Sequence, residues 1–287
     1  MIDLHTHSTA SDGTLSPEAL VDLAADKGLT ALALTDHDTV AGIPPALARG
    51  AVRGIHVVPG MELGVRWDGA GQMHVLGYYI RHDDSHLGER LDWLRARRRE
   101  RAARIVAKLN RLGVEIAFGR VEEITGGESI GRPHLARALL EAGHVASVSE
   151  AFDRYLSRGR PAFEEKEQLN PKEAVGLVKS SGGAAVLAHP GTLKLPTAQL
   201  SRCIEELKAY GLAGLETIWS GHNRAQVESY SALARRLGLL TTGGSDFHGE
   251  NKPGIELGTG RNNVQVPDSV LAALQNHRRR NAPADAN

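Results

Sequence analysis

The sequence contains a single cysteine, Cys203, in 287 residues. One thiol can form neither an internal disulfide nor a cysteine-based zinc site, so we expect a reducing, cytoplasmic setting. Long apolar runs are also missing, since no stretch approaches the roughly 18 residues that a membrane span requires. The first residues lack the positive charge and apolar run of a signal peptide. These absences favour a soluble, unprocessed protein.

An excess of charge of either sign is missing as well. The 34 basic residues balance the 34 acidic ones. The whole-protein field therefore offers no broad attraction to nucleic acid or to a membrane surface, and any recognition of phosphate must be local. Hydrophobic residues make up 41% and charged residues 24%, which is typical of a globular chain. The length fits one large domain, or one domain with an insertion.

Short apolar segments alternate with helical patterns along most of the chain. Strands are predicted in MIDLHTH, LTALALTDHD, IHVVPGMELGV, MHVLGYYI, AAVLAHPG, LAGLETIWS and LGLLTTGGSDFHG. Several of them are continuously apolar, as in a parallel sheet covered on both faces. One predicted helix begins at Ser16 and Pro17 and ends at Gly28, and another begins at Asn170 and Pro171. Two more helices are predicted near 197–210 and 223–237. This alternation predicts an α/β fold, a distorted barrel of seven strands.

Residues 84–165 lack strand patterns and carry helical ones, which predicts a helical insertion into the barrel. The barrel would then comprise 1–83 and 166–268, and residues 269–287 would form a C-terminal tail whose segment NHRRRNAPADAN is frayed. The insertion contains the run RARRRERAAR. It could contact RNA, but acidic residues nearby favour a solvated helix face.

Histidines and carboxylates gather at the predicted strand ends. They are His5, His7, Asp12, Asp36, His37, Glu62, His74, His189, Asp246 and His248. A single histidine at a strand end is more often a satisfied polar residue than a ligand. Strand ends of a barrel converge on one face, however, and burying so many such groups without a cation costs several kcal/mol per group. The set predicts a metal cluster, whereas His56, His82, His86, His144 and His277 are expected in loops or on the surface.

The segments DLHTHSTASDGTLSP, ALTDHDT, GMELGV, HVLGYYI, AHPG and GGSDFHG resemble the motifs of the PHP superfamily, named for polymerase and histidinol phosphatase domains. The resemblance covers nearly the whole chain. The insertion and the motif GRPHLARAL are similar to those of the branch that contains bacterial 3′,5′-nucleoside bisphosphate phosphatases and the 5′-to-3′ exoribonuclease RNase AM. The fold implied is a distorted (β/α)7 PHP-type barrel with a helical insertion domain.

The resemblance also implies three divalent metal ions, with Glu62 shared between two of them. Their expected ligands are His5, His7, Glu62 and Asp246 for the first, Asp12, His37 and His248 for the second, and Glu62, His74 and His189 for the third. The resemblance favours manganese, and the ligand types also admit zinc or iron.

The activity implied is metal-dependent hydrolysis of a phosphate ester, in which a metal-activated hydroxide attacks phosphorus. Glu62 and Asp246 would be essential to it. The substrates would be pAp-like nucleotides, which lose the 3′-phosphate, or short RNA with a 5′-phosphate. Candidate donors of the proton to the leaving group are His222 and Asp38, although Glu216 and His222 in ETIWSGHNR match the family pattern only approximately.

Recognition of a second phosphate falls to Arg132 and His134, because a guanidinium grips phosphate with two hydrogen bonds and an imidazole adds a donor. The alternative for this pair is an ordinary helix start with Arg132 in solvent. Arg160 is a further candidate for the substrate cleft.

Two other classes of function remain. A metal-dependent amidohydrolase with a carbamylated lysine would need a lysine at a strand end, and none of the motif strands supplies one. A non-catalytic PHP module would be expected to lose some ligands, whereas the set is complete here. The oligomeric state stays open.

Overall fold

A computed structural model describes residues 1–69, 71–126, 129–261 and 263–281. The strands are β1 (Ile2–Thr6), β2 (Ala31–Leu34), β3 (His56–Val65), β4 (Met73–Tyr78), β5 (Ala184–Leu187), β6 (Gly214–Trp219) and β7 (Leu240–Gly244). The helices are α1 (Pro17–Asp26), α2 (Ile43–Arg53), α3 (Ser85–Arg111), α4 (Phe118–Thr125), α5 (Arg132–Glu141), α6 (Val148–Ala151), α7 (Pro171–Ser180), α8 (Thr197–Tyr210), α9 (Arg224–Arg236) and α10 (Asp268–Asn281). A π-helical turn covers Phe152–Leu156, and 3-10 turns cover Pro190–Leu193 and Gly249–Asn251.

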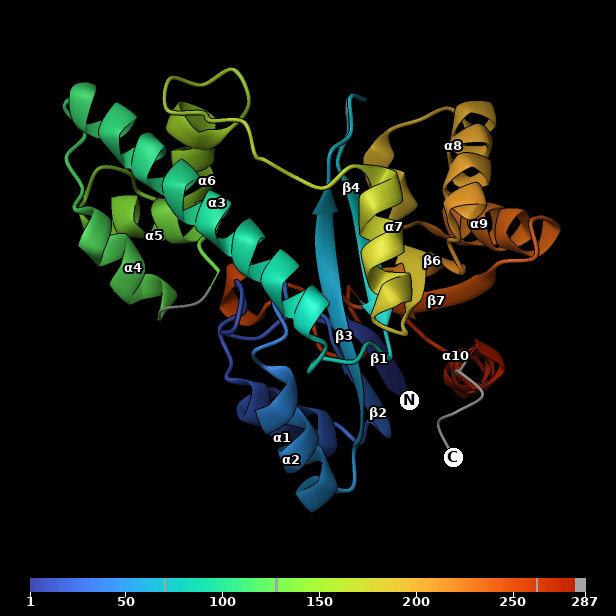
Figure 1. Ribbon diagram of the computed structural model, residues 1–287. Helices are drawn as coiled ribbons and strands as arrows, with labels where there is room; N and C mark the ends of the chain where they lie inside the picture. The colour runs from blue at the N-terminus through green and yellow to red at the C-terminus, as the bar shows by residue number, and fades with distance from the viewer. Residues whose placement is uncertain (70, 127–128, 262, 282–287) are drawn as a thin grey trace.

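The strands form one seven-stranded sheet in the order of the sequence, from β1 to β7 (Figure 1). At the closing edge, the main-chain N–H of His7 donates to the carbonyl of Phe247 and that of Asp246 to the carbonyl of His5, each at 2.9 Å. Gly244 allows this approach, because a Cβ there would lie 2.4 Å from the main-chain nitrogen of His5. The predicted α/β fold with a nearly closed, distorted barrel is confirmed.

Strand β4 departs from the parallel arrangement that its neighbours follow. It is antiparallel to both β3 and β5, whereas the remaining neighbouring pairs are parallel. A hairpin joins β3 to β4 with Gly64 opposite His74, and no helix intervenes. A strand that runs backwards begins at the edge where parallel strands end. His74, the second residue of β4, therefore lies at the same rim as the ends of β1 and β2.

The helix signals in the sequence operate as predicted at α1 and α7. The side chain of Ser16 accepts a hydrogen bond from the N–H of Ala19, and Pro17 is the first residue of α1. Asn170 forms a capping box with Glu173 at the start of α7. These side chains satisfy N–H groups that the first helical turn leaves unpaired. Helix α2 was not anticipated from the sequence.

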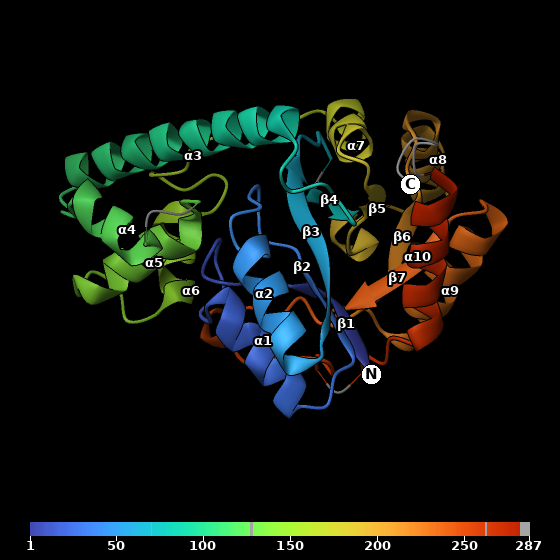
Figure 2. The ribbon, with the colours of Figure 1, turned by 60° about the horizontal axis from the view of Figure 1, so that its bottom comes forward.

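Helices α3 to α6 form a lobe beside the barrel, with α3 running from one to the other (Figures 1 and 2). The lobe has its own core, which includes Ile105, Leu109, Val121, Leu135 and Leu139. The first half of α3 packs differently: Leu87, Leu91 and Leu94 belong to the core of the barrel. One continuous helix therefore carries side chains in both cores.

Residues 269–281 are not a frayed tail. They continue α10, whose Val270 and Leu274 are buried in the same core as Ile2 and Leu4 of β1. The expectation from NHRRRNAPADAN is wrong for its first half, because this polar stretch extends a helix that is anchored by the apolar residues before it; 282–287 lie outside the described residues. Within the described part of the chain, no helix is long and apolar enough to cross a membrane.

Candidate metal centre

The side chains predicted as ligands meet at the rim where β1, β2 and β7 end and β4 begins. They form four overlapping groups, and within each group the ligand atoms lie within 4.8 Å of one another. The groups are His7, Asp12, His37 and His248; His5, Glu62 and His189; His5, His7 and Asp246; and His37, Glu62 and His74. All nine residues expected as ligands thus occur in at least one group.

Glu62 lies at the centre of the cluster; it is the seventh residue of β3 and is 1% exposed. Its two carboxylate oxygens face different imidazoles. Oε2 lies 3.3 Å from Nε2 of His5, 3.3 Å from Nε2 of His7 and 3.2 Å from Nδ1 of His37, and Oε1 lies 2.7 Å from Nδ1 of His74 and 2.9 Å from Nε2 of His189. A carboxylate divided in this way is suited to bridging two cations.

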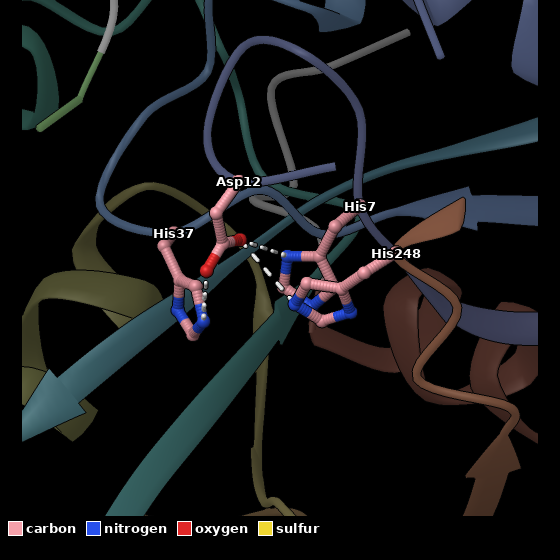
Figure 3. A group of neighbouring side chains, drawn as sticks. All are labelled: His7, Asp12, His37 and His248. Carbon is pink, nitrogen blue, oxygen red and sulfur yellow. Dashed lines mark ion pairs between the residues drawn. The ribbon is translucent and has the colours of Figure 1, made fainter. Parts of the chain in front are cut away.

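Asp12 enters from the loop after β1 and lies between three imidazoles (Figure 3). Its Oδ1 is 3.3 Å from Nε2 of His248 and 3.8 Å from Nδ1 of His7, and its Oδ2 is 4.0 Å from Nε2 of His37. Asp36 is not in any of the groups. Instead it accepts hydrogen bonds from the hydroxyls of Ser8 and Ser11, at 2.7 and 2.6 Å, and so holds the loop that carries Asp12.

Asp246 supplies the carboxylate at the end of β7. Its Oδ1 lies 3.5 Å from Nε2 of His7, and its Oδ2 accepts from Lys252 at 2.7 Å and from the indole of Trp219 at 3.2 Å. Its φ of 60° and that of His189, 25°, lie in a region that non-glycine residues rarely adopt. Strained backbone at these two positions aims both side chains at the cluster.

The pKa shifts of Glu62, Asp246 and His37 favour the forms that bind a cation, whereas neighbouring carboxylates outweigh burial and raise the pKa of His5 and of His248. Burial alone raises the pKa of Glu62, but the neighbouring imidazoles of His37, His74 and His5 hold it well below its usual range. Lys252 and His5 likewise overcome burial and lower the pKa of Asp246. Burial lowers the pKa of His37 to about 4, against the opposing pull of Glu62. Ionised carboxylates and neutral imidazoles are the forms that bind divalent metals.

Unpaired nitrogen atoms point to the same conclusion. Both ring nitrogens of His7 and Nδ1 of His37 are buried and make no hydrogen bond. Buried polar atoms of this kind are costly unless they bind something, and here they face carboxylates of the cluster. The residues therefore fit divalent cations that accept nitrogen and oxygen ligands, such as manganese, zinc or iron.

Glu216, buried on β6, orients two of the histidines of the cluster through hydrogen bonds. Nδ1 of His5 donates to its Oε1 at 2.9 Å, and its Oε2 accepts from the main-chain N–H of His189 at 2.6 Å. The first bond fixes the tautomer of His5, so that Nε2 offers its lone pair to the cluster. Such supporting carboxylates are a regular feature of histidine metal sites.

A cleft of about 400 Å³ opens beside the centre, between the barrel and the insertion. Asp12, His37 and His74 line one side of it. Its cationic lining residues are Arg98, Arg101, Arg132, Arg158 and Lys166, and Phe152 and Phe163 add an apolar wall. The cluster therefore faces a positively charged space large enough for a nucleotide.

Comparison with known proteins decides the family. Residues 3–213 match the PHP domain. This chain belongs to the PHP domain family. It is 35% identical over 258 residues to a 3′,5′-nucleoside bisphosphate phosphatase from Chromobacterium violaceum, covering 90% of each chain. It is also 35% identical over 269 residues to a 5′-3′ exoribonuclease from Haemophilus influenzae, covering 94% of this chain and 96% of that one.

A solved structure from Bifidobacterium adolescentis, provisionally described as a metal-dependent phosphoesterase, superimposes with a TM-score of 0.86 at 31% identity and covers 96% of both chains. These matches extend over almost the whole PHP chain, insertion included. The predicted class of a metal-dependent phosphoesterase, and hence a hydrolase, is confirmed, and the non-catalytic alternative is set aside.

Two residues expected to donate a proton in the PHP centre are held in other roles. His222 uses both ring nitrogens: Nδ1 donates to the carbonyl of Thr217 at 3.0 Å, and Nε2 accepts from the N–H of Gly191 at 3.3 Å. Asp38 is buried, and although burial raises its pKa, the charges of Arg98 and Lys166 lower it far below the usual range. An ionised carboxylate has no proton to give and both ring nitrogens of His222 are engaged, so the geometry favours neither residue as the proton donor.

The residues expected to bind substrate are separated by the structure. Arg132 lines the cleft, with its guanidinium 5.6 Å from the ring centre of Phe152. His134 is absent from the lining of that cleft and turns Nδ1 back to accept from the N–H of Gly131 at 2.9 Å. Arg160 is exposed and lies outside the lining, to which Arg158 belongs, so its role in substrate binding stays a prediction.

Besides Arg158, three lining cations were missed. Arg98 and Arg101 belong to the run that was interpreted as a solvated helix face, yet Arg101 is 8% exposed and Arg98 reaches Asp38. The signal was present in the spacing: these two positions follow Leu94 by four and seven residues, on the side of α3 that is otherwise apolar. Lys166, in a loop, carries no comparable signal. The solvated interpretation holds for Arg99, whose side chain is 63% exposed.

Proposed function

We propose that this PHP protein removes the 3′-phosphate from nucleoside 3′,5′-bisphosphates and releases nucleotides from the 5′ ends of short RNA. The observation that carries the proposal is the cleft itself. It joins the ligand residues His37 and His74 to Arg132, whose Nη1 donates to a main-chain carbonyl, that of Leu156, at 3.2 Å. Within the part of the chain that the structure describes, this guanidinium has no carboxylate partner, so it is available to a second phosphate.

The proposal includes three divalent ions, manganese by family resemblance, held by the residues that were predicted for each. Glu62 would be shared by two of them, in keeping with its divided oxygens. When bound, such ions activate water and neutralise charge on the phosphoryl group.

The chain's own residues supply the remaining requirements. Glu216 keeps His5 in one tautomer, and Lys252 and Trp219 fix the carboxylate of Asp246. Arg132 would grip the phosphate that is not hydrolysed and so position the other one at the centre. The rings of Phe152 and Phe163 limit the access of water on the side of the insertion. Proximity and orientation of this kind contribute a large part of catalysis.

The first test compares three substrates with the manganese-loaded protein: pAp, AMP and a short 5′-phosphorylated RNA. We expect release of inorganic phosphate from pAp with a higher kcat/KM than from AMP, because only pAp can place one phosphate at Arg132 and the other at the metal centre. We also expect mononucleotides from the RNA, seen by chromatography. Failure to release phosphate or nucleotide from any of the three would refute the proposal, even though the family assignment would stand.

The second test changes Arg132 to alanine. We expect KM for pAp to rise about tenfold to a hundredfold, the usual effect of losing charge-assisted hydrogen bonds, and KM for 3′-AMP, which lacks the second phosphate, to stay unchanged. The control is Arg137→Ala, on the same helix, where an exposed arginine pairs with Glu141. Equal rises of KM for both substrates would show that Arg132 does not select the second phosphate.

A further inference from the structure

Arg98 and Lys166 meet at one buried carboxylate beside the metal centre. Oδ2 of Asp38 accepts from Nε of Arg98 at 2.7 Å and lies 3.4 Å from Nζ of Lys166, and Oδ1 accepts from the N–H of Gly64 at 3.1 Å. The side chain of Asp38 is 1% exposed, that of Arg98 11% and that of Lys166 21%. One anion therefore holds two nearly buried cations in fixed positions at the wall of the cleft.

Among the described residues, this arrangement leaves positive charge without an anionic partner. Next to the pair, Arg101 donates Nε to the main-chain carbonyl of Glu164 at 2.9 Å. Arg132 also bonds a main-chain carbonyl rather than a carboxylate. Glu165, a lining carboxylate away from the metal ligands, lies 3.2 Å from Arg158. Partly buried cations that outnumber their anions are stabilised by binding an anion from outside.

The titration behaviour of these groups agrees with a missing anion. Burial and the adjacent charge of Arg98 lower the pKa of Lys166 to about 8, although Asp38 acts in the opposite direction. Burial and the charges of Arg132 and Arg98 lower the pKa of Arg101 to about 10. Each shift disfavours the charged form, as expected when cations crowd together.

The position of the pair separates it from Arg132. Asp38 directly follows the ligand His37, and its Oδ1 bonds Gly64, which pairs across the hairpin with the ligand His74. The amine of Lys166 lies over Gly64, where a Cβ would come within 2.2 Å of Nζ. Arg98 and Lys166 are thus tied through Asp38 to the rim of the metal centre, whereas Arg132 is held by the main-chain carbonyl of Leu156.

We propose that Arg98 and Lys166 bind the phosphoryl group that is hydrolysed, and that Asp38 is a positioning residue that holds both in place. Arg98 uses Nε and Nη2 on Asp38, which leaves the Nη1 donors for a phosphoryl oxygen, and Lys166 has two further N–H donors. This subsite rests on the proposed phosphoesterase function and is distinct from that of Arg132. It would serve monophosphates and bisphosphates alike.

The test compares Arg98→Met and Lys166→Met with Arg99→Met, the neighbouring exposed arginine, as the control. Titration calorimetry with inorganic phosphate on the metal-loaded proteins should show affinity weakened about tenfold to a hundredfold in the first two and unchanged in the third. In the hydrolysis assay, kcat/KM should fall by a similar factor for pAp and for AMP, in contrast to Arg132→Ala. Metal content should match that of the control.

Two results would overturn the inference. One is phosphate affinity equal to the control in both variants. The other is a loss confined to pAp, which would place Arg98 and Lys166 in the subsite of Arg132. Arg98→Lys, which keeps the charge beside Asp38, should bind phosphate with intermediate affinity. If the wild type hydrolysed no phosphate ester, the proposed function would fail, but the phosphate titration would still decide whether this subsite exists.

Discussion

Glu62→Gln should reduce kcat/KM by about a thousandfold or more, and it should lower the metal content of the purified protein. Loss of a group that only supports a metal ligand already lowers metal affinity or activity by about 10- to 100-fold, and Glu62 lies at the centre of the cluster itself. Its two oxygens face five imidazoles. An amide offers one oxygen and no charge, so it can neither serve both sides of the cluster nor neutralise two cations.

Elemental analysis and steady-state kinetics at saturating manganese measure these two effects together. Glu228→Gln is the matched control, because Glu228 pairs with Arg224 on the surface of α9. The control should retain full activity and metal content. Turnover by metal-replete Glu62→Gln at the level of the wild type would remove Glu62 from its role as the shared ligand.

The largest effect on stability is expected at Asp38. Asp38→Asn should lower the free energy of unfolding by about 2–4 kcal/mol, because breaking a buried ion pair leaves a charge without compensation. This loss of stability is smaller than the loss expected for a fully buried ion pair, because the side chain of Lys166 is 21% exposed. Urea denaturation of the metal-loaded protein measures this difference, provided that the slope with denaturant is unchanged.

The control is Asp92→Asn, an exposed aspartate on α3 that pairs with Arg95, where we expect a change of less than about 0.5 kcal/mol. Added phosphate should recover part of the loss in Asp38→Asn, because an anion bound by Arg98 and Lys166 replaces the missing carboxylate. A change at Asp38 as small as that at Asp92 would show that the two cations do not depend on it.

Local patterns in the sequence predicted the barrel because its strands are short, apolar and separated by recognisable helical patterns. They did not reveal that β4 is antiparallel, although the number of residues between Val65 and Met73 already excluded a parallel crossover, which needs a dozen or more. Helix α10 was missed for another reason. Its last turns are so polar that they resemble a tail, and what anchors it is tertiary packing of Val270 and Leu274.

The ligands of the centre were accessible from the sequence because each is fixed by a strand end or by a motif loop. Roles that depend on a partner far away in the chain were not accessible. In the sequence, Asp38 is a candidate acid, because nothing shows that Arg98, 60 residues later, donates a hydrogen bond to its carboxylate. Glu216 gains its importance through His5, which lies 211 residues before it, and through His189. Such pairings are decided by tertiary structure.

Helix α3, which packs in both cores, couples the folding of the barrel to that of the insertion. α3 has 27 residues and so extends roughly 40 Å, with its first half in one core and its second half in the other. Excising the insertion would take Leu87, Leu91 and Leu94 out of the barrel and leave a void there. The two lobes therefore form one cooperative unit, in which the arginines of α3 keep their place only as long as the barrel itself is folded.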